Sequence, residues 1–275
     1  LMSYLANLFR PFQFFLPSKL RNMIRLMPIL FPKKQLKEKE IYSIKSKKRI
    51  ARVALLTGCV QKVLSPQINE ATIRLLNRHG VEVVIPKKIR CCGSLNHHLG
   101  KADLAHQDFI NNINVWYDEY IKGNLDAILS NTSGCGTTLK DYGFIFRGNK
   151  ELRKKAKKIS ELTKDVSEYL FENLKLNFKS KTKKIKIAYH SACSMQHGQK
   201  VHSQPIELLN KTENKVMEVP DGHLCCGSAG TYNILQNEIA EQLLKDKVKN
   251  IESIKPDIIL TGNIGCIAQI SNGTN

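Results

Sequence analysis

The sequence predicts an α/β fold of two tandem Rossmann-like lobes with parallel sheets, related by internal duplication and preceded by a short helical N-terminal segment. The first observation behind this prediction is a repeat of cysteine spacing. Twice, one cysteine is followed by 31 residues and then by a Cys-Cys pair, at Cys59, Cys91 and Cys92 and again at Cys193, Cys225 and Cys226. Secondly, short apolar runs alternate with helical segments in both copies, which is typical of parallel strands joined by crossover helices.

Residues 1–49 are expected to form a basic segment of short helices and turns. The first 50 residues carry 12 Lys/Arg and two Asp/Glu, in a chain of 275 residues whose net charge is +19. Four prolines interrupt this stretch, and a proline cannot continue a helix. A basic, apolar strip of this kind suits an anionic membrane surface or a partner subunit, and it equally suits a linker that packs against the protein body. Nucleic acid is not expected as a partner, because no base-reading module accompanies the basic residues.

The first lobe is expected over residues 50–146. Its strands are predicted where short apolar runs occur, at 50–56, 81–85 and 125–130. Its helices are predicted from Ser65-Pro66 to His79-Gly80 and over roughly 100–122. Residues 147–184 follow as a basic, mostly helical linker. The second lobe is expected over 185–275, with strands at 185–189, 215–219 and 256–261.

All eight cysteines lie at, or just after, the carboxyl end of a predicted strand. Because the carboxyl ends of parallel strands meet at one edge of a sheet, the four thiols of each copy are expected to converge. Inert core cysteines do not explain a repeated set. Structural disulfides do not suit the cytosolic, reducing compartment that is expected here, since no signal peptide is predicted. Four thiolates around one point indicate an iron–sulfur cluster or zinc. The predicted ligands are Cys59, Cys91, Cys92, Cys135, Cys193, Cys225, Cys226 and Cys266.

This arrangement resembles the cysteine-rich CCG domain, which occurs in heterodisulfide reductase B subunits, lactate-utilisation proteins and the iron–sulfur subunits of glycolate oxidase. Within that group the similarity to the glycolate oxidase subunits is strongest, and it covers residues 50–275 nearly continuously. The segments that carry it include LLTGCVQ (55–61), CCGSLNHHLG (91–100), SNTSGCGTTLKDYG (130–143), YHSACSMQHGQ (189–199), GHLCCGSAGTYNILQ (222–236) and TGNIGCIAQI (261–270).

The resemblance implies an iron–sulfur electron-transfer subunit of a glycolate oxidase (dehydrogenase) complex. Flavoprotein subunits that carry FAD would oxidise glycolate to glyoxylate, and this subunit would pass electrons towards a membrane quinone without being catalytic alone. A [4Fe–4S] cluster is the expected cofactor, with zinc as the alternative in a lobe. The expected location is the cytoplasm, with peripheral contact at the inner face of the membrane. The alternatives are a lactate-utilisation or heterodisulfide-reductase-type CCG protein and a zinc-stapled docking subunit.

The chain departs from the family pattern in two respects. Many CCG domains close with Cys-x2-Cys, and this chain has Thr132 and Asn263 at the first of those positions, so four thiolates per copy are expected. The family's ferredoxin-type domain and a last strand and helix are not in the sequence, which is therefore expected to be a fragment.

Five histidines lie near the cysteines, and polar packing rather than a role at a cluster is their favoured interpretation: His97, His98, His190, His197 and His223.

Overall fold

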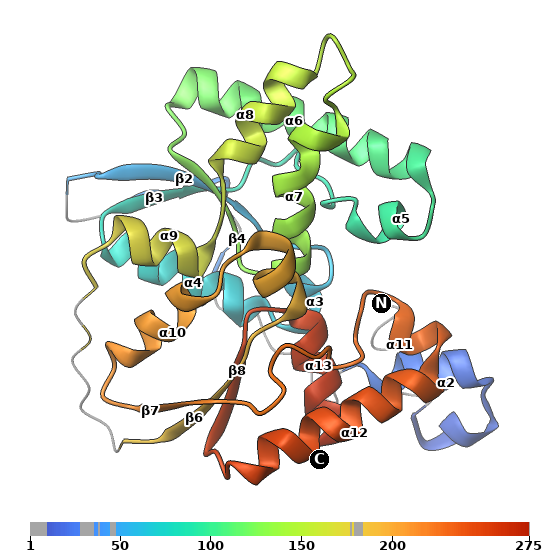
Figure 1. Cartoon of the computed structure of the whole chain (residues 1–275). Coiled ribbons are helices and arrows are strands. Elements are labelled where there is room, and N and C mark those ends of the chain that lie inside the picture. Colours follow the sequence, from blue (N-terminus) through green and yellow to red (C-terminus); the bar gives the residue numbers. More distant parts are fainter. Residues whose placement is uncertain are drawn as a thin grey trace. The chain divides into compact units, whose positions relative to one another are not determined.

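The computed structural model describes residues 10–27, 36–37, 39–44, 48–176, 178 and 184–274 (Figure 1). The chain divides into two compact units. The first-lobe unit comprises Lys33–Phe178 and Ser194–Leu208, and the second-lobe unit comprises Leu1–Pro32, Lys179–Cys193 and Leu209–Asn275. Each unit contains one sheet, and the α/β fold with predominantly parallel strands is confirmed.

The sheet of the first-lobe unit has the strand order β1-β3-β2-β4-β5. Neighbouring strands run parallel except for β1, which pairs antiparallel with β3 at the edge. Because both faces of this sheet are covered, its central strands are buried without alternation, as in residues 52–56 of β2. The strands are β1 (Ile41–Tyr42), β2 (Ala51–Leu56), β3 (Val81–Val84), β4 (Ala127–Ser130) and β5 (Thr163–Asp165).

Helices cover both faces of this sheet (Figure 1). On one face α6 (Ala102–Gly123), α7 (Ser133–Ile145) and α8 (Arg153–Leu162) bury Trp116, Phe109 and Tyr142. On the other face α4 (Pro66–Arg78) and α9 (Val166–Asn173) bury a second apolar cluster. Two short helices, α3 (Gln61–Leu64) and α5 (Ser94–His98), follow the ends of β2 and β3.

Three features of the first-lobe unit were not predicted. The segment before residue 50, expected to form short helices and turns, contains β1 at the antiparallel edge of the sheet. The segment expected as a helical linker contains β5, which extends the sheet beside β4, because its three residues, Thr-Lys-Asp, give no apolar signal. In addition, residues 194–208, which follow the first cysteine of the second copy, pack within this unit. They form the π-helix η2 (Ser194–Gln199) and most of α10 (Ser203–Asn210). The η2 turn is fixed on α7 by Gln199 Nε2, which donates to the carbonyl of Ser133 at 2.9 Å.

The second-lobe unit has a fully parallel sheet of order β7-β6-β8. Its strands are β6 (Lys186–His190), β7 (Lys215–Glu218) and β8 (Ile258–Thr261), and its helices are α11 (Tyr232–Leu235), α12 (Asn237–Ser253) and α13 (Ile264–Gly273). All three strands match their predicted positions to within two residues.

Residues 10–27 of the basic N-terminal segment pack within the second-lobe unit as short helices, whereas its described residues from 36 onward belong to the first-lobe unit and include β1. The 3-10 turn η1 (Arg10–Phe15) precedes α2 (Ser18–Arg25), and the guanidinium of Arg10 donates to the Met27 carbonyl at 2.6 Å. Arg25 forms an ion pair with Glu241 of α12 at 3.6 Å. Phe12, Phe14 and Phe15 remain exposed. Among the described residues, no helix combines the length and apolar character that crossing a bilayer requires.

Candidate metal centres

The four thiols of the first copy lie together at the carboxyl edge of the first sheet. Cys59 follows β2, Cys91 and Cys92 follow β3, and Cys135 lies in the first turn of α7, directly after β4. The Sγ atoms of Cys59 and Cys91 are 3.5 Å apart. The thiol of Cys92 lies within hydrogen-bonding reach of both Cys91 and Cys135. The expected convergence is therefore present in this lobe.

The close approach of these thiols changes their acidity. Hydrogen bonds with Cys59 and Cys92 lower the pKa of Cys91 to about 2. The hydrogen bond with Cys91, together with burial, raises the pKa of Cys59. Hydrogen bonds with Cys135 and Cys91, and burial, raise the pKa of Cys92. Deprotonation of all four adjacent thiols is unfavourable because the negative charges repel one another, and a bound cation would offset that repulsion.

The Cys-Cys-Gly backbone has a shape that only glycine permits at its third residue. Gly93 has φ +77°, and a Cβ there would lie 2.3 Å from Cε1 of the buried Phe109 ring. Two side chains hold the preceding carbonyls: Asn112 Nδ2 donates to the carbonyl of Cys91 at 2.8 Å, and the Tyr142 hydroxyl donates to that of Cys92 at 3.0 Å. Sequence reasoning missed Asn112 and Tyr142, because nothing in the local pattern of either helix marks them.

Cys59 and Cys91 also border a cavity of about 540 Å³ in the first-lobe unit. Cys59 itself is exposed, whereas Cys92 is buried with 3% of its surface accessible. Cys59 and Cys91 are therefore the first-lobe thiols that face this cavity, on the β2–β3 side.

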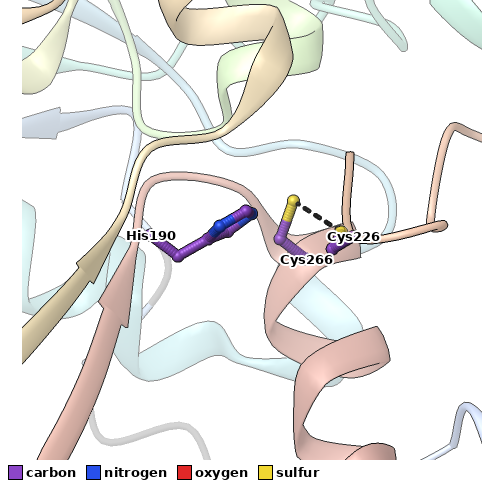
Figure 2. A group of neighbouring side chains, drawn as sticks. All are labelled: His190, Cys226 and Cys266. Carbon is purple, nitrogen blue, oxygen red and sulfur yellow. Dashed lines mark hydrogen bonds between the residues drawn. The ribbon is translucent and has the colours of Figure 1, made fainter. Parts of the chain in front are cut away.

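The second copy repeats the arrangement with a more buried set of thiols. The Sγ atoms of Cys226 and Cys266 are 3.3 Å apart, and both residues are buried (Figure 2). Cys225 lies within hydrogen-bonding reach of Cys193 and Cys226, and its Sγ accepts from the Gly227 N–H at 3.3 Å. Gly227 has φ +88°, and a Cβ there would lie 2.4 Å from the Ala240 carbonyl oxygen. All eight cysteines of the chain are free thiols.

The acidity of the second set follows the first. Hydrogen bonds with Cys193 and Cys226 lower the pKa of Cys225 to about 2. Hydrogen bonds with Cys225 and Cys266, and burial, raise the pKa of Cys226. The hydrogen bond with Cys226 lowers the pKa of Cys266 to about 6; burial opposes this shift, and the His190 imidazole supports it.

A histidine joins the second set. His190 ends β6 with 1% of its surface exposed, and one of its ring nitrogens and the Sγ atoms of Cys226 and Cys266 all lie within 4.8 Å of one another. Figure 2 shows the imidazole pointing from the strand end towards Cys266 on α13. The favoured sequence interpretation, polar packing at the loop edge, does not describe this fully buried ring. His97, His98, His197 and His223 are exposed, in agreement with that interpretation.

The two positions where many family members have a fifth cysteine have structural contacts here. The hydroxyl of Thr132 donates to Gln61 Oε1 at 2.5 Å, within a buried network that includes Asn131 and Asn69. The side chain of Asn263 caps α13 by accepting from the Gly265 N–H at 2.8 Å. Neither side chain supplies a thiolate, so each copy has four thiols.

This donor chemistry fits a metal. Thiolates select soft or borderline cations, and sets of four are typical of iron–sulfur clusters and of structural zinc. Cys59, Cys91, Cys92 and Cys135 would hold such a group in the first lobe, and Cys193, Cys225, Cys226 and Cys266 would hold one in the second. The like-charge opposition among these groups is itself a reason for a cation at each set.

Comparison with known proteins gives consistent matches. The glycolate oxidase iron-sulfur subunit of Escherichia coli (strain K12) is 35% identical over 258 residues, which are 94% of this chain and 60% of that protein. A probable glycolate oxidase iron-sulfur subunit of Bacillus subtilis (strain 168) is 30% identical over 265 residues, 94% of this chain and 58% of that protein. Lactate utilization protein A of the same strain is 26% identical over 220 residues, 80% of this chain and 90% of that protein.

This chain thus spans less than two thirds of the length of either iron-sulfur subunit. The CCG cysteine-rich domain matches it twice, over residues 53–140 and 187–271. Each matched segment contains one complete set of four cysteines. The chain therefore belongs to the CCG cysteine-rich domain family and carries two copies of the domain.

Proposed function

We propose that this chain is an iron–sulfur electron-transfer subunit of a glycolate oxidase complex. The observation that carries the proposal is the presence of two sets of four thiols, each at the carboxyl edge of a parallel sheet. The relatives at 35% and 30% identity support it, because their names describe iron-sulfur subunits of that oxidase.

An iron–sulfur cluster, when bound, supplies one-electron transfer. The residues of this chain would then ligate the cluster, exclude water and adjust its potential. The N–H of Gly227 already donates to a cysteine sulfur, and such N–H···S contacts raise the potential of a cluster by offsetting its negative charge. Burial of Cys226 and Cys266 would lower the reduction potential of an anionic cluster, because burial removes the solvation of the negative charge. The more exposed first-lobe set suits exchange of electrons with a partner.

The remaining parts of the complex follow from the same proposal. Flavoprotein subunits that bind FAD would oxidise glycolate to glyoxylate, and the electrons would continue towards a membrane quinone. The proposed location is the cytoplasm, at the inner face of the membrane. Exposed Phe12, Phe14 and Phe15 beside Lys19 and Arg21 give the N-terminal segment the apolar and basic character that contact with a membrane or a partner subunit requires.

Anaerobic purification tests the proposal. We expect iron and acid-labile sulfide with broad absorbance at about 400 nm, characteristic of iron–sulfur clusters. Changing Cys92 or Cys226 to Ser should remove the cluster of one lobe and leave that of the other, whereas His223→Gln, at an exposed site, should leave both. A colourless protein with stoichiometric zinc and no iron would refute electron transfer and leave the zinc-stapled docking role.

A lactate-utilisation protein is the second candidate, because the match covers 90% of lactate utilization protein A. Electron transfer from a purified glycolate-oxidising flavoprotein, compared with that from a lactate-oxidising one, separates the two. Reduction of the bound centres by the lactate enzyme alone would favour this candidate.

A further inference from the structure

The second-lobe site contains a buried histidine that has no nitrogen or oxygen partner for its ring nitrogens within the described residues. His190 is 1% exposed, and within the described parts of the chain neither Nδ1 nor Nε2 makes a hydrogen bond to a nitrogen or oxygen atom; its interaction is with the Cys266 thiol, whose pKa it lowers. A buried polar group without a partner is unfavourable, so such a group in a folded protein calls for an explanation. A metal ion bound to one ring nitrogen would supply a partner for it.

The distances around His190 suit metal binding. A ring nitrogen and the Sγ atoms of Cys226 and Cys266 form a group in which every pair lies within 4.8 Å. Two ligand atoms of a tetrahedral zinc lie about 3.5 Å apart, given bonds of about 2.0–2.3 Å. Small side-chain movements would therefore bring all three atoms onto one metal. Throughout the described residues, this is the one group of three or more such ligands so close together.

The duplication supplies an internal comparison. His190 stands three residues before Cys193, and the residue three before Cys59 is Leu56. Leu56 ends β2 and packs in the apolar core with 3% exposure. The fold therefore accepts an apolar side chain at this strand end, and nothing in the architecture of the lobe requires an imidazole there. The two sites therefore differ at this position, and the histidine is present in the second lobe, whose thiols are more buried than those of the first.

We propose that the second-lobe site is a mixed imidazole–thiolate metal centre, in which His190 binds the metal beside Cys226 and Cys266, whereas the first-lobe site is ligated by thiolates alone. This inference rests on the proposed function, since it takes the second-lobe thiols to hold a metal, and it applies to zinc as well as to an iron–sulfur cluster. An imidazole that takes the place of one of the four second-lobe thiolates lowers the negative charge of the ligand set by one, so a cluster ligated in this way would have a higher reduction potential than an all-thiolate one.

The experiment uses the full chain labelled with 15N in histidine and purified without oxygen. An iron-loaded sample is reduced to its paramagnetic state, and a zinc-loaded sample is exchanged with Co²⁺. In either case, pulsed electron paramagnetic resonance measures the hyperfine coupling of nitrogen bound directly to the metal. We expect that coupling in the unmodified chain, its loss in His190→Leu, and its persistence in the matched control His223→Leu, which changes an exposed histidine two residues before Cys225. For Co²⁺, His190→Leu should also weaken binding at one site by at least about tenfold.

The possible failures are distinguishable. A loaded chain without nitrogen coupling, or one whose coupling survives in His190→Leu, overturns the histidine ligand and leaves the proposed function standing. A chain that binds none of iron, zinc or Co²⁺ overturns both. The measurement on the unmodified chain does not depend on the stability of any variant, and His190→Leu places at the end of β6 the residue that the first lobe has at the end of β2.

Discussion

The glycine of the first Cys-Cys-Gly segment offers a sharp test of how the backbone positions the thiols. Replacing Gly93 with alanine should destabilise the fold in two ways. The residue would have to keep a left-handed backbone with φ +77°, and its Cβ would lie only 2.3 Å from the Phe109 ring and 3.2 Å from the Ala105 carbonyl oxygen. The ring cannot swing away freely, because Phe109 is fully buried and its centroid lies 4.8 Å from that of Tyr142. Gly100 is a matched control, since its φ is +74° and no atom lies within 4 Å of its Cβ position.

The two substitutions should therefore separate backbone strain from collision. The left-handed conformation costs about 1–2 kcal/mol for a residue with a Cβ, and we expect Gly100→Ala to lower the free energy of unfolding by that amount. Overpacking a rigid core adds about 1–3 kcal/mol, so Gly93→Ala should cost about 2–5 kcal/mol.

Urea unfolding of the metal-loaded chain measures both values, and metal analysis shows whether the first-lobe site still fills. Only Gly93→Ala should lose metal, because it displaces the backbone that carries Cys92. Equal costs for the two variants, with metal retained in both, would refute the close-packing explanation of this glycine.

Three further predictions concern the supports of the first lobe. Burial raises the pKa of Asp165 to about 6, above the value of about 3.9 in an unfolded chain, so its contribution to stability falls as the pH rises through this interval. In the unmodified chain this residue should lower the free energy of unfolding by about 1.4 kcal/mol between pH 5 and pH 8. Asp165→Asn keeps a capping side chain for α9 and should remove this pH-dependent decrease. An unchanged pH dependence in urea unfolding would contradict the prediction. Tyr142→Phe leaves the Cys92 carbonyl without its donor and should cost about 1–3 kcal/mol in the same assay, against a smaller effect for Tyr117→Phe, which loses no such bond within the described structure. Asn131→Leu breaks its bonds to Gln61 and Asn69 and should cost at least as much, and a neutral result would show that this network is dispensable.

Helices and strands that combine an apolar run with a clear start or stop signal could be predicted from the sequence. The helix α4 begins at Pro66 and is followed by Gly80 at φ +85°, as its signals predict. The strand β5 was missed because it is a short polar strand held by its neighbour β4 rather than by its own pattern. Packing of residues 194–208 within the first-lobe unit was equally out of reach, since contacts such as Gln199 with Ser133 join positions 66 residues apart.

The candidate site shows the same division between local pattern and tertiary contact. Convergence of the thiols followed from topology, because residues after parallel strands must meet at one edge of the sheet. The burial of His190 beside Cys226 and Cys266 did not follow, since a histidine at a strand end has the same local pattern whether it is exposed or buried. One signal was available in the alignment of the two copies, where His190 matches an apolar core residue, Leu56. Where one copy of a duplicated domain has a polar residue and the other has an apolar core residue at the aligned position, the two copies differ in chemistry.

The opposed pKa shifts within each set connect the site to the stability of the fold. In each lobe burial disfavours ionisation, and neighbouring thiols share protons instead of separating as thiolates. Metal binding must release those protons, so the affinity should rise with pH and the bound metal should stabilise the lobe that holds it. Helices α7 and α13 carry Cys135 and Cys266 in their first turns, directly after the last strand of each copy. A metal held by these thiols would therefore link three strand ends of one sheet.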